Sequence, residues 1–100
     1  MARLDVHPLR GEDDLYVLDV QAEVLSQLAT RAVVPLLPSA AAPKPIGELN
    51  PVFDIGGRPY VLVTQAIATV PARELTPAVA SLAEHRDRVT RALDLLLVGF

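Results

Sequence analysis

The chain of 100 residues has no cysteine and carries a formal net charge of −3. This length suits one domain over residues 1–100, with a thin core that no disulfide reinforces. The acidic balance disfavours a direct nucleic-acid partner, because proteins that bind nucleic acid need an excess of Lys and Arg. The first twenty residues carry five carboxylates and lack the apolar core of a secretory signal, so we expect a cytoplasmic protein. The longest charge-poor stretch, residues 32–43, is too short to cross a bilayer, so we expect no membrane partner.

Two strands are expected near the N-terminus. Apolar and polar residues alternate over residues 2–7, the period-two pattern of a half-buried strand, with His7 on the polar side. Residues 10–14 are typical of a turn. The run over residues 15–21 is apolar on both sides except at two polar residues, one of them Asp19, which is typical of a central strand. We therefore predict that these two strands pair as a hairpin.

Proline shapes the next segment. Residues 32–36 predict a third strand, in which Pro35 lacks the N–H group that a strand ladder needs. We therefore expect an edge strand or a bulge at this position. A loop that contains three prolines is expected to follow over residues 38–45.

Glycine gives the clearest local signal in the chain. Residues 52–55 and 58–64 are both strand-like, and Gly56 and Gly57 join them. Because the turns of tight hairpins need positive φ, which glycine adopts without a Cβ clash, we predict a hairpin here. A further strand is expected over residues 67–70, ending at the proline that follows.

The pattern changes to a helical period at Pro77. Thr76 is a suitable N-cap, and a proline at the first helical position loses nothing because that N–H has no partner in a helix. We therefore predict a helix from Pro77 to the last residues. Its apolar stripe would consist of Val79, Leu82, Val89, Leu93 and Leu96. Its solvated face would carry two acid-first i,i+4 pairs, Glu84 with Arg88 and Asp87 with Arg91.

Catalytic and metal-binding patterns do not stand out. His7 and His85 fall in different elements, with no second histidine or carboxylate at metal-ligand spacing, so we interpret both as ordinary polar positions. Ser81 shares a helix face with His85, but neither a nucleophile elbow nor a glycine-rich phosphate loop accompanies them. We expect no metal, no cofactor and no enzymatic activity.

One charged residue lies in a segment that we expect to be buried. Asp19 stands between Leu18 and Val20, and a buried carboxylate must be paired or hydrogen-bonded. We predict a structural pair, with Arg31 as the candidate partner. The alternative is a catalytic acid, which would need a second titratable group that the sequence does not identify.

The last residues are more apolar than one helix face requires. Residues 95–98 place Leu or Val on every side of the last helical turn, and Phe100 follows just beyond Gly99. A helix that packs on a sheet hides one stripe, so some of these side chains must point away from their own core. Two uses are open: a subunit interface alone, or the additional recognition of a separate target.

Several short motifs follow one another along the chain. They are Asp19-Val20-Gln21, Val33-Val34-Pro35-Leu36, Leu49-Asn50-Pro51-Val52, Ile55-Gly56, Ala68-Thr69-Val70-Pro71 and a final helix ending in Gly99 and one apolar residue. In this order and spacing they resemble the CcdB family of bacterial toxins over almost the whole chain. The resemblance implies an SH3-like β-barrel with a small additional antiparallel sheet and one C-terminal α-helix, assembled as a homodimer.

The resemblance also implies a function. CcdB-type toxins are the toxic half of type II toxin–antitoxin modules, which serve in plasmid maintenance and transcription regulation. They bind the A subunit of DNA gyrase with the end of the last helix and trap the enzyme on cleaved DNA, without catalysis of their own. A CcdA-like antitoxin with a disordered tail neutralises the dimer, and the family points to the first turn and the proline-rich loop as its contacts.

Candidate gyrase-binding residues follow from the family by position: Val24, Leu25, Asp94, Val98, Gly99 and Phe100. Gly99 matches the family's penultimate glycine, and Phe100 keeps its apolar last position. Val98 stands where the best-known toxins have Trp, and Asp94 stands where they have Asn; Ala22 replaces a serine near the apolar pair. Loss of an aromatic anchor commonly costs about 2 kcal/mol, so we expect a weaker poison or one fitted to a different gyrase.

Two alternative functions stay open. A ribonuclease toxin of the same barrel type should carry a basic groove with a proton-transfer residue, and the sequence has no basic cluster of that kind. The other alternative is a non-poisoning CcdB-like dimer that still binds antitoxin, for which Val98 and Asp94 are the motivation.

Overall fold

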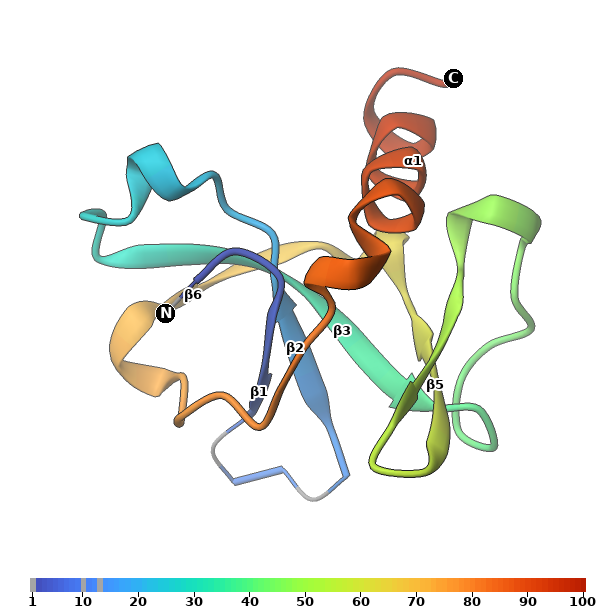
Figure 1. Ribbon diagram of the computed structural model, residues 1–100, viewed down its shortest axis with the longest axis horizontal. Helices are drawn as coiled ribbons and strands as arrows, with labels where there is room; N and C mark the ends of the chain where they lie inside the picture. The colour runs from blue at the N-terminus through green and yellow to red at the C-terminus, as the bar shows by residue number, and fades with distance from the viewer. Residues whose placement is uncertain (1, 10, 13) are drawn as a thin grey trace.

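The computed structural model describes residues 2–9, 11–12 and 14–100. Within these residues the chain forms one antiparallel sheet and a C-terminal helix (Figure 1). The strands are β1 (Asp5–Pro8), β2 (Tyr16–Asp19), β3 (Thr30–Pro38), β4 (Val52–Ile55), β5 (Arg58–Leu62), β6 (Ala68–Pro71) and β7 (Ala80–Ser81). The helix is α1 (Arg86–Leu97). Short 3-10 turns occupy the connections: η1 (Glu23–Leu25), η2 (Gly47–Leu49), η3 (Thr64–Ala66), η4 (Ala72–Glu74) and η5 (Ala83–His85).

The long strand β3 is the centre of the sheet. Along one edge it pairs with β2, and along the other it pairs first with β6 and then with β5. The strands follow the order β4-β5-β3-β2-β1-β7, with β6 branching from β3, and the sheet bends into a nearly closed barrel (Figure 1). The predicted fold, a mainly β barrel with one C-terminal helix, is confirmed.

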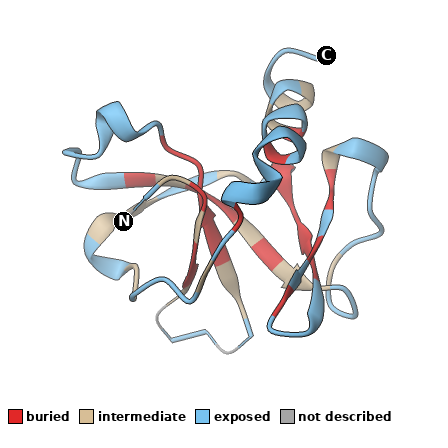
Figure 2. Cartoon of the chain, in the orientation of Figure 1, coloured by how far each residue is buried: buried red, intermediate tan, exposed pale blue. Residues whose placement is uncertain are grey.

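The core fills the inside of the barrel and the underside of α1. Figure 2 shows the buried positions concentrated on the strands where they cross beneath the helix. The buried cluster consists of Leu4, Val6, Leu18, Val20, Val34, Leu36, Phe53, Ile55, Tyr60, Leu62, Leu82 and Val89. From α1 the inner side takes part, through the buried Val89 and Ala92 and the partly buried Leu93. None of the described helices is long and apolar enough to cross a membrane.

Both predicted hairpins are confirmed. β1 pairs with β2 in antiparallel register, although the turn predicted over residues 10–14 lies partly outside the described residues. β4 and β5 are joined by Gly56 and Gly57, whose φ angles are 62° and 85°. Two successive positive φ angles give the primed turn whose twist matches that of the flanking strands. The strand predicted over residues 67–70 is β6, and the proline-rich loop separates β3 from η2.

The position of Pro35 differs from the prediction. Pro35 lies in the middle of the central strand, opposite Val17 of β2, and not at an edge. The N–H and C=O groups of a strand residue point to the same side, and the carbonyl of Pro35 accepts from the N–H of Val63 at 2.9 Å. The missing N–H therefore faces the place where β3 changes partner from β6 to β5. A proline is tolerated there because the ladder is already interrupted.

The helix begins later than predicted. Thr76 is not an N-cap, because its hydroxyl donates to the carbonyl of Pro8 at 2.8 Å. The N–H groups of Val79 and Leu82 donate to carbonyls of the N-terminal strand segment at 2.9 and 2.8 Å, so this stretch runs along the sheet as β7. Pro77 suits an extended chain as well as a first helical turn. Pairing with a distant sheet edge therefore overrides the local helix signal.

The predicted apolar stripe is right in its later part. Leu82 and Val89 are buried, and Leu93 and Leu96 are half-buried. Val79 is 56% exposed, because it lies in the extended segment before the helix and not on its inner face.

The solvated face is exposed as predicted, but its charges pair differently. The structure describes all four residues of the two expected pairs, and neither pair forms an ion pair. Arg91 instead reaches Glu48 of η2, with Nε 3.0 Å from the carboxylate. Arg88 donates to the carbonyl of Val52 at 3.2 Å and lies 4.6 Å from the centre of the Phe53 ring. Both arginines therefore connect α1 to the chain between η2 and β4.

Candidate functional site

The end of α1 is closed by a glycine. The N–H groups of Val98 and Gly99 both donate to the carbonyl of Asp94, at 2.8 and 2.9 Å. Gly99 has φ of 96°, a left-handed conformation that a side chain disfavours and that commonly ends helices. The backbone reverses at this point, and Phe100 leaves the helix axis just after it.

The side chains at this end are exposed to solvent. Leu97 is 69% exposed, Val98 60% and Phe100 87%. We call these three residues the terminal patch. Leu95 and Leu96 are half-buried and line a hollow together with Ile46. The prediction that part of this apolar end points away from its own core is confirmed.

A second exposed apolar group lies between β2 and β3. Val24 and Leu25 belong to η1 and are 87% and 47% exposed, and Leu28 just after it is 50% exposed. We call residues 23–28 the apolar turn. The sequence predicted Val24 and Leu25 as binding residues only through the family resemblance, because a short polar-flanked segment has no periodicity to show which side chains are covered.

The six residues predicted to bind gyrase therefore fall into two groups. Asp94, Val98, Gly99 and Phe100 lie together at the exposed end of α1. Val24 and Leu25 lie in η1, and Figure 1 shows η1 and the end of α1 on the same upper side of the molecule but apart from each other. No hydrogen bond or ion pair between described residues joins the two groups. One chain thus presents two separate apolar groups on that side.

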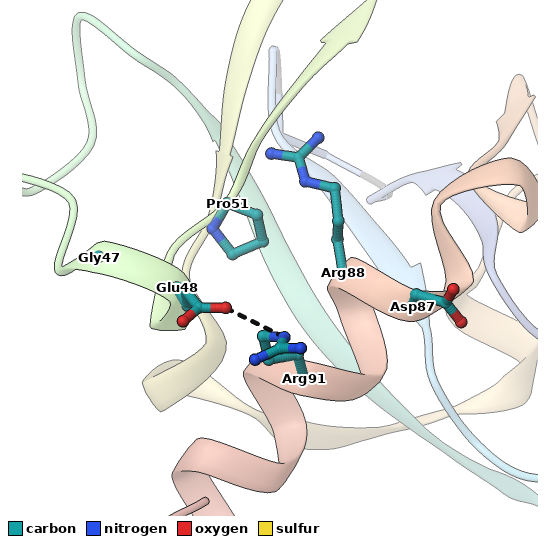
Figure 3. Close-up of a pocket in the computed structure, with 6 residues that line it drawn as sticks. All are labelled: Gly47, Glu48, Pro51, Asp87, Arg88 and Arg91. Atoms are coloured by element: carbon teal, nitrogen blue, oxygen red, sulfur yellow. Dashed lines mark ion pairs between the residues drawn. The ribbon is translucent and has the colours of Figure 1, made fainter.

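A charged cleft of about 420 Å³ lies between η2 and the first turns of α1 (Figure 3). Its lining consists of Gly47, Glu48, Pro51, Asp87, Arg88 and Arg91. Figure 3 shows Arg91 facing Glu48 while Arg88 extends past Pro51 toward β4. The two carboxylates balance the two guanidinium groups, and each arginine already has a partner. The sequence did not reveal this cleft, because Glu48 and Arg91 are far apart along the chain.

The two histidines have different surroundings. His85 is exposed, with its ring centre 5.1 Å from that of Phe53. His7 was predicted on the polar side of a half-buried strand, but it is 1% exposed, because the segment before β7 covers it. Its Nδ1 lies 2.8 Å from the carbonyl of Thr76, so Nδ1 must be the protonated nitrogen. Among the described residues, no group of three His, Asp or Glu side chains is placed to hold a metal ion.

The predicted pair between Asp19 and Arg31 is confirmed. Their side chains are 0% and 1% exposed, and both Nη2 and Nε of Arg31 bond Oδ2 of Asp19, at 2.5 and 3.1 Å. The other carboxylate oxygen accepts from the N–H of Gln21 at 3.0 Å. With both oxygens occupied and no exposed surface, Asp19 has a structural role, and the catalytic alternative has no surface on which to act.

Comparisons with known proteins agree with this architecture. The family described as CcdB protein matches residues 3–99. Among solved structures, Mycobacterium tuberculosis toxin MazF-mt6 is similar with a TM-score of 0.75 and 17% identity, covering 92% of this chain and 94% of that one. A structure described as an Mtb toxin gives a TM-score of 0.72 and 16% identity, covering 92% and 99%. At these identities the structural likeness is one of fold, whereas the family match spans nearly the whole sequence, and the chain therefore belongs to the CcdB family.

Proposed function

We propose that this chain is the toxin of a type II toxin–antitoxin module that binds the A subunit of DNA gyrase, traps gyrase on cleaved DNA, and is neutralised by a CcdA-like antitoxin. Membership of the CcdB family supports the toxin–antitoxin role in general. The terminal patch supports a protein target. The toxin performs no catalysis in this proposal; it acts by occupying a surface of the enzyme.

The observation that carries the proposal is the exposure of Leu97, Val98 and Phe100 at the end of α1. Each large apolar side chain left in water forfeits about 1.5–3 kcal/mol of burial free energy. Contiguous apolar surface of this kind marks a binding site on small proteins, and aromatic side chains such as Phe100 are typical anchors of such sites.

The shape of the chain end adds to this argument. The rigid helix fixes where Leu97 stands, and Gly99 turns the backbone so that Phe100 projects beyond the helix. A preorganised contact loses less conformational entropy on binding than a flexible tail would. In the proposed homodimer two such ends and two apolar turns would contribute to one gyrase-binding face.

The direct test is a DNA cleavage assay with purified gyrase. We expect the wild-type chain to produce gyrase-dependent DNA breaks and the chain lacking residues 98–100 to produce none. The matched control is Val79→Ala, which removes an exposed apolar side chain outside both apolar groups and should leave the breaks unchanged. Absence of breaks with the wild-type chain would refute gyrase poisoning.

Each of the two alternatives has its own test: an RNA cleavage assay for the first, and the gyrase assay with a further variant for the second. Cleavage of RNA by the purified chain would favour the ribonuclease hypothesis, which is supported by the fold that the chain shares with MazF-mt6. The non-poisoning hypothesis depends on Val98 and Asp94, where the family has Trp and Asn. If Val98→Trp poisons gyrase and the wild type does not, the hypothesis of a non-poisoning dimer is correct. A fully active wild type excludes that hypothesis.

A further inference from the structure

The side chain of Gln21 links the apolar turn to the beginning of β3. Gln21 is 8% exposed and lies two residues after the end of β2. Its Nε2 donates to the carbonyl of Leu25 at 2.8 Å, and its Oε1 accepts from the N–H of Ala32 at 2.9 Å. One amide group therefore holds both η1 and the beginning of β3. Only this orientation of the amide satisfies both partners, because a carbonyl needs a donor and an N–H needs an acceptor.

Gln21 is itself anchored in the barrel. Its backbone N–H donates to Asp19, whose carboxylate is held by the buried guanidinium of Arg31. A chain of hydrogen bonds thus runs from the buried pair through Gln21 to Leu25. Such a fully bonded polar network is rigid, because every member fixes the orientation of the next.

The apolar turn has little else to fix it. None of the η1 residues is buried, so packing does not hold the turn in place. Its backbone bonds are those of short turns: the N–H groups of Leu25, Ser26 and Leu28 each donate to the carbonyl three residues earlier, at 2.9, 3.0 and 3.1 Å. Short exposed turns of this kind open readily on their own. Two side-chain contacts tie the turn to the rest of the fold: the part-buried bond from Gln21 to Leu25 at 2.8 Å, and an exposed one from the Arg3 N–H to the Glu23 carboxylate at 3.3 Å. The Gln21 contact is the shorter and the better shielded from water, and it alone joins the turn to the buried pair.

We propose that Gln21 is the positioning residue of the apolar turn: its amide fixes where Val24 and Leu25 stand and so sets how tightly this surface binds its protein target. The proposal rests on the proposed function, in which that target is the gyrase A subunit. Gln21 acts through the turn and does not itself contact the target.

The variant that isolates this role is Gln21→Glu. The new side chain has nearly the same shape, and one carboxylate oxygen can still accept from Ala32. The other oxygen faces the carbonyl of Leu25, and two acceptors repel each other where the amide made a bond. Protonation of the carboxyl restores a donor, and burial and the facing carbonyl both favour the protonated form. The variant should therefore regain the contact with Leu25 as the pH falls.

Two measurements on the full-length chain test the proposal. The first is amide hydrogen exchange, corrected for intrinsic rates, in which we expect the Ser26 and Leu28 amides of Gln21→Glu to lose about tenfold in protection near neutral pH while the barrel amides keep theirs. The second is binding to a purified gyrase A fragment, which we expect to weaken about tenfold near neutral pH and to recover at about pH 5.5.

The matched control is Gln27→Glu, the same chemical change on an exposed residue of the same turn. It adds the same charge without touching Leu25, so we expect full protection of the turn and no gain of binding on acidification beyond that of the wild type. Equal protection in Gln21→Glu and wild type would overturn the proposal, as would a pH profile for Gln21→Glu that matches Gln27→Glu. If the wild type fails to bind the gyrase fragment, the proposed function is refuted, and hydrogen exchange alone decides whether Gln21 positions the turn.

Discussion

The terminal patch and the apolar turn are both exposed and apolar, but they are held in place differently. The terminal patch sits on a regular helix, and its closing element, Gly99, is a single residue whose conformation is local. The apolar turn is built on a single short 3-10 turn, and the buried side chain of Gln21, which follows β2, bonds it to the polar network of Asp19 and Arg31. A small protein can thus present apolar surface either on a rigid element or by anchoring a loop to a buried polar network.

The largest expected effect comes from breaking the anchor of the turn. Asp19→Asn leaves Arg31 as a buried, unpaired charge, so we expect the free energy of unfolding to fall by about 3–5 kcal/mol in urea titrations. The control is Asp14→Asn, which breaks an exposed pair with Arg58 and should cost no more than about 1 kcal/mol. Equal losses in the two variants would contradict a structural role for the buried pair.

A smaller effect is expected from backbone strain, and it should differ between the two glycine turns. Gly57 and Gly99 have φ of 85° and 96°, so an Ala at either position is strained. Gly57→Ala should lower the free energy of unfolding by about 1–2 kcal/mol, because that turn joins two barrel strands. Gly99→Ala should change the free energy of unfolding by less than about 0.5 kcal/mol, because the chain end can relax. The same variant should nevertheless produce fewer gyrase-dependent DNA breaks. A large loss of stability in Gly99→Ala would mean that the terminal patch is part of the folded core.

Alkaline pH tests the barrel on which both apolar groups stand. Burial raises the pKa of Tyr60 above its ordinary value of 10.0, so the folded state favours the protonated phenol. The corresponding stability is present below the unfolded pKa and is lost as the pH rises through the folded pKa. Unfolding curves should therefore show the wild type losing stability more steeply than Tyr60→Phe as the pH rises from the unfolded pKa of Tyr60 to its raised folded pKa. Parallel curves for the two proteins would contradict this assignment.

The smallest effect is expected at the charged cleft. Glu48 and Arg91 are about two-thirds exposed, so their ion pair is screened and should contribute no more than about 0.5 kcal/mol in a double-mutant cycle. A coupling well above this value would show that the cleft helps to hold α1 on the barrel, and with it the terminal patch.

The structure follows the sequence-based predictions where one or two residues decide it. Gly56 and Gly57 determine their hairpin by conformation alone, and Asp19 required a partner wherever it was buried. The predictions were wrong where a distant segment decides the local structure. Thr76 and Pro77 are compatible with the start of a helix and also with the extended segment that they form. Only pairing with the N-terminal strand selects the extended conformation. The burial of His7 depends on the same pairing.

The candidate site divides in the same way. The excess of apolar residues at the end of α1 was visible in the sequence, because a helix face can hide only one stripe. The exposure of Leu28 and the anchoring of the turn by Gln21 were not visible, since both depend on where β2 and β3 place the intervening chain. The ion pair from Glu48 to Arg91 likewise exists only once η2 packs beside α1.

Isothermal titration of the purified chain against a gyrase A fragment tests most directly whether the terminal patch binds the gyrase A subunit. We expect saturable binding by the wild type and a loss of about thirtyfold in affinity for Phe100→Ala, because an exposed aromatic anchor is removed while the fold is untouched. Equal affinity of Phe100→Ala and wild type, or no binding by a folded wild-type chain, would contradict the claim.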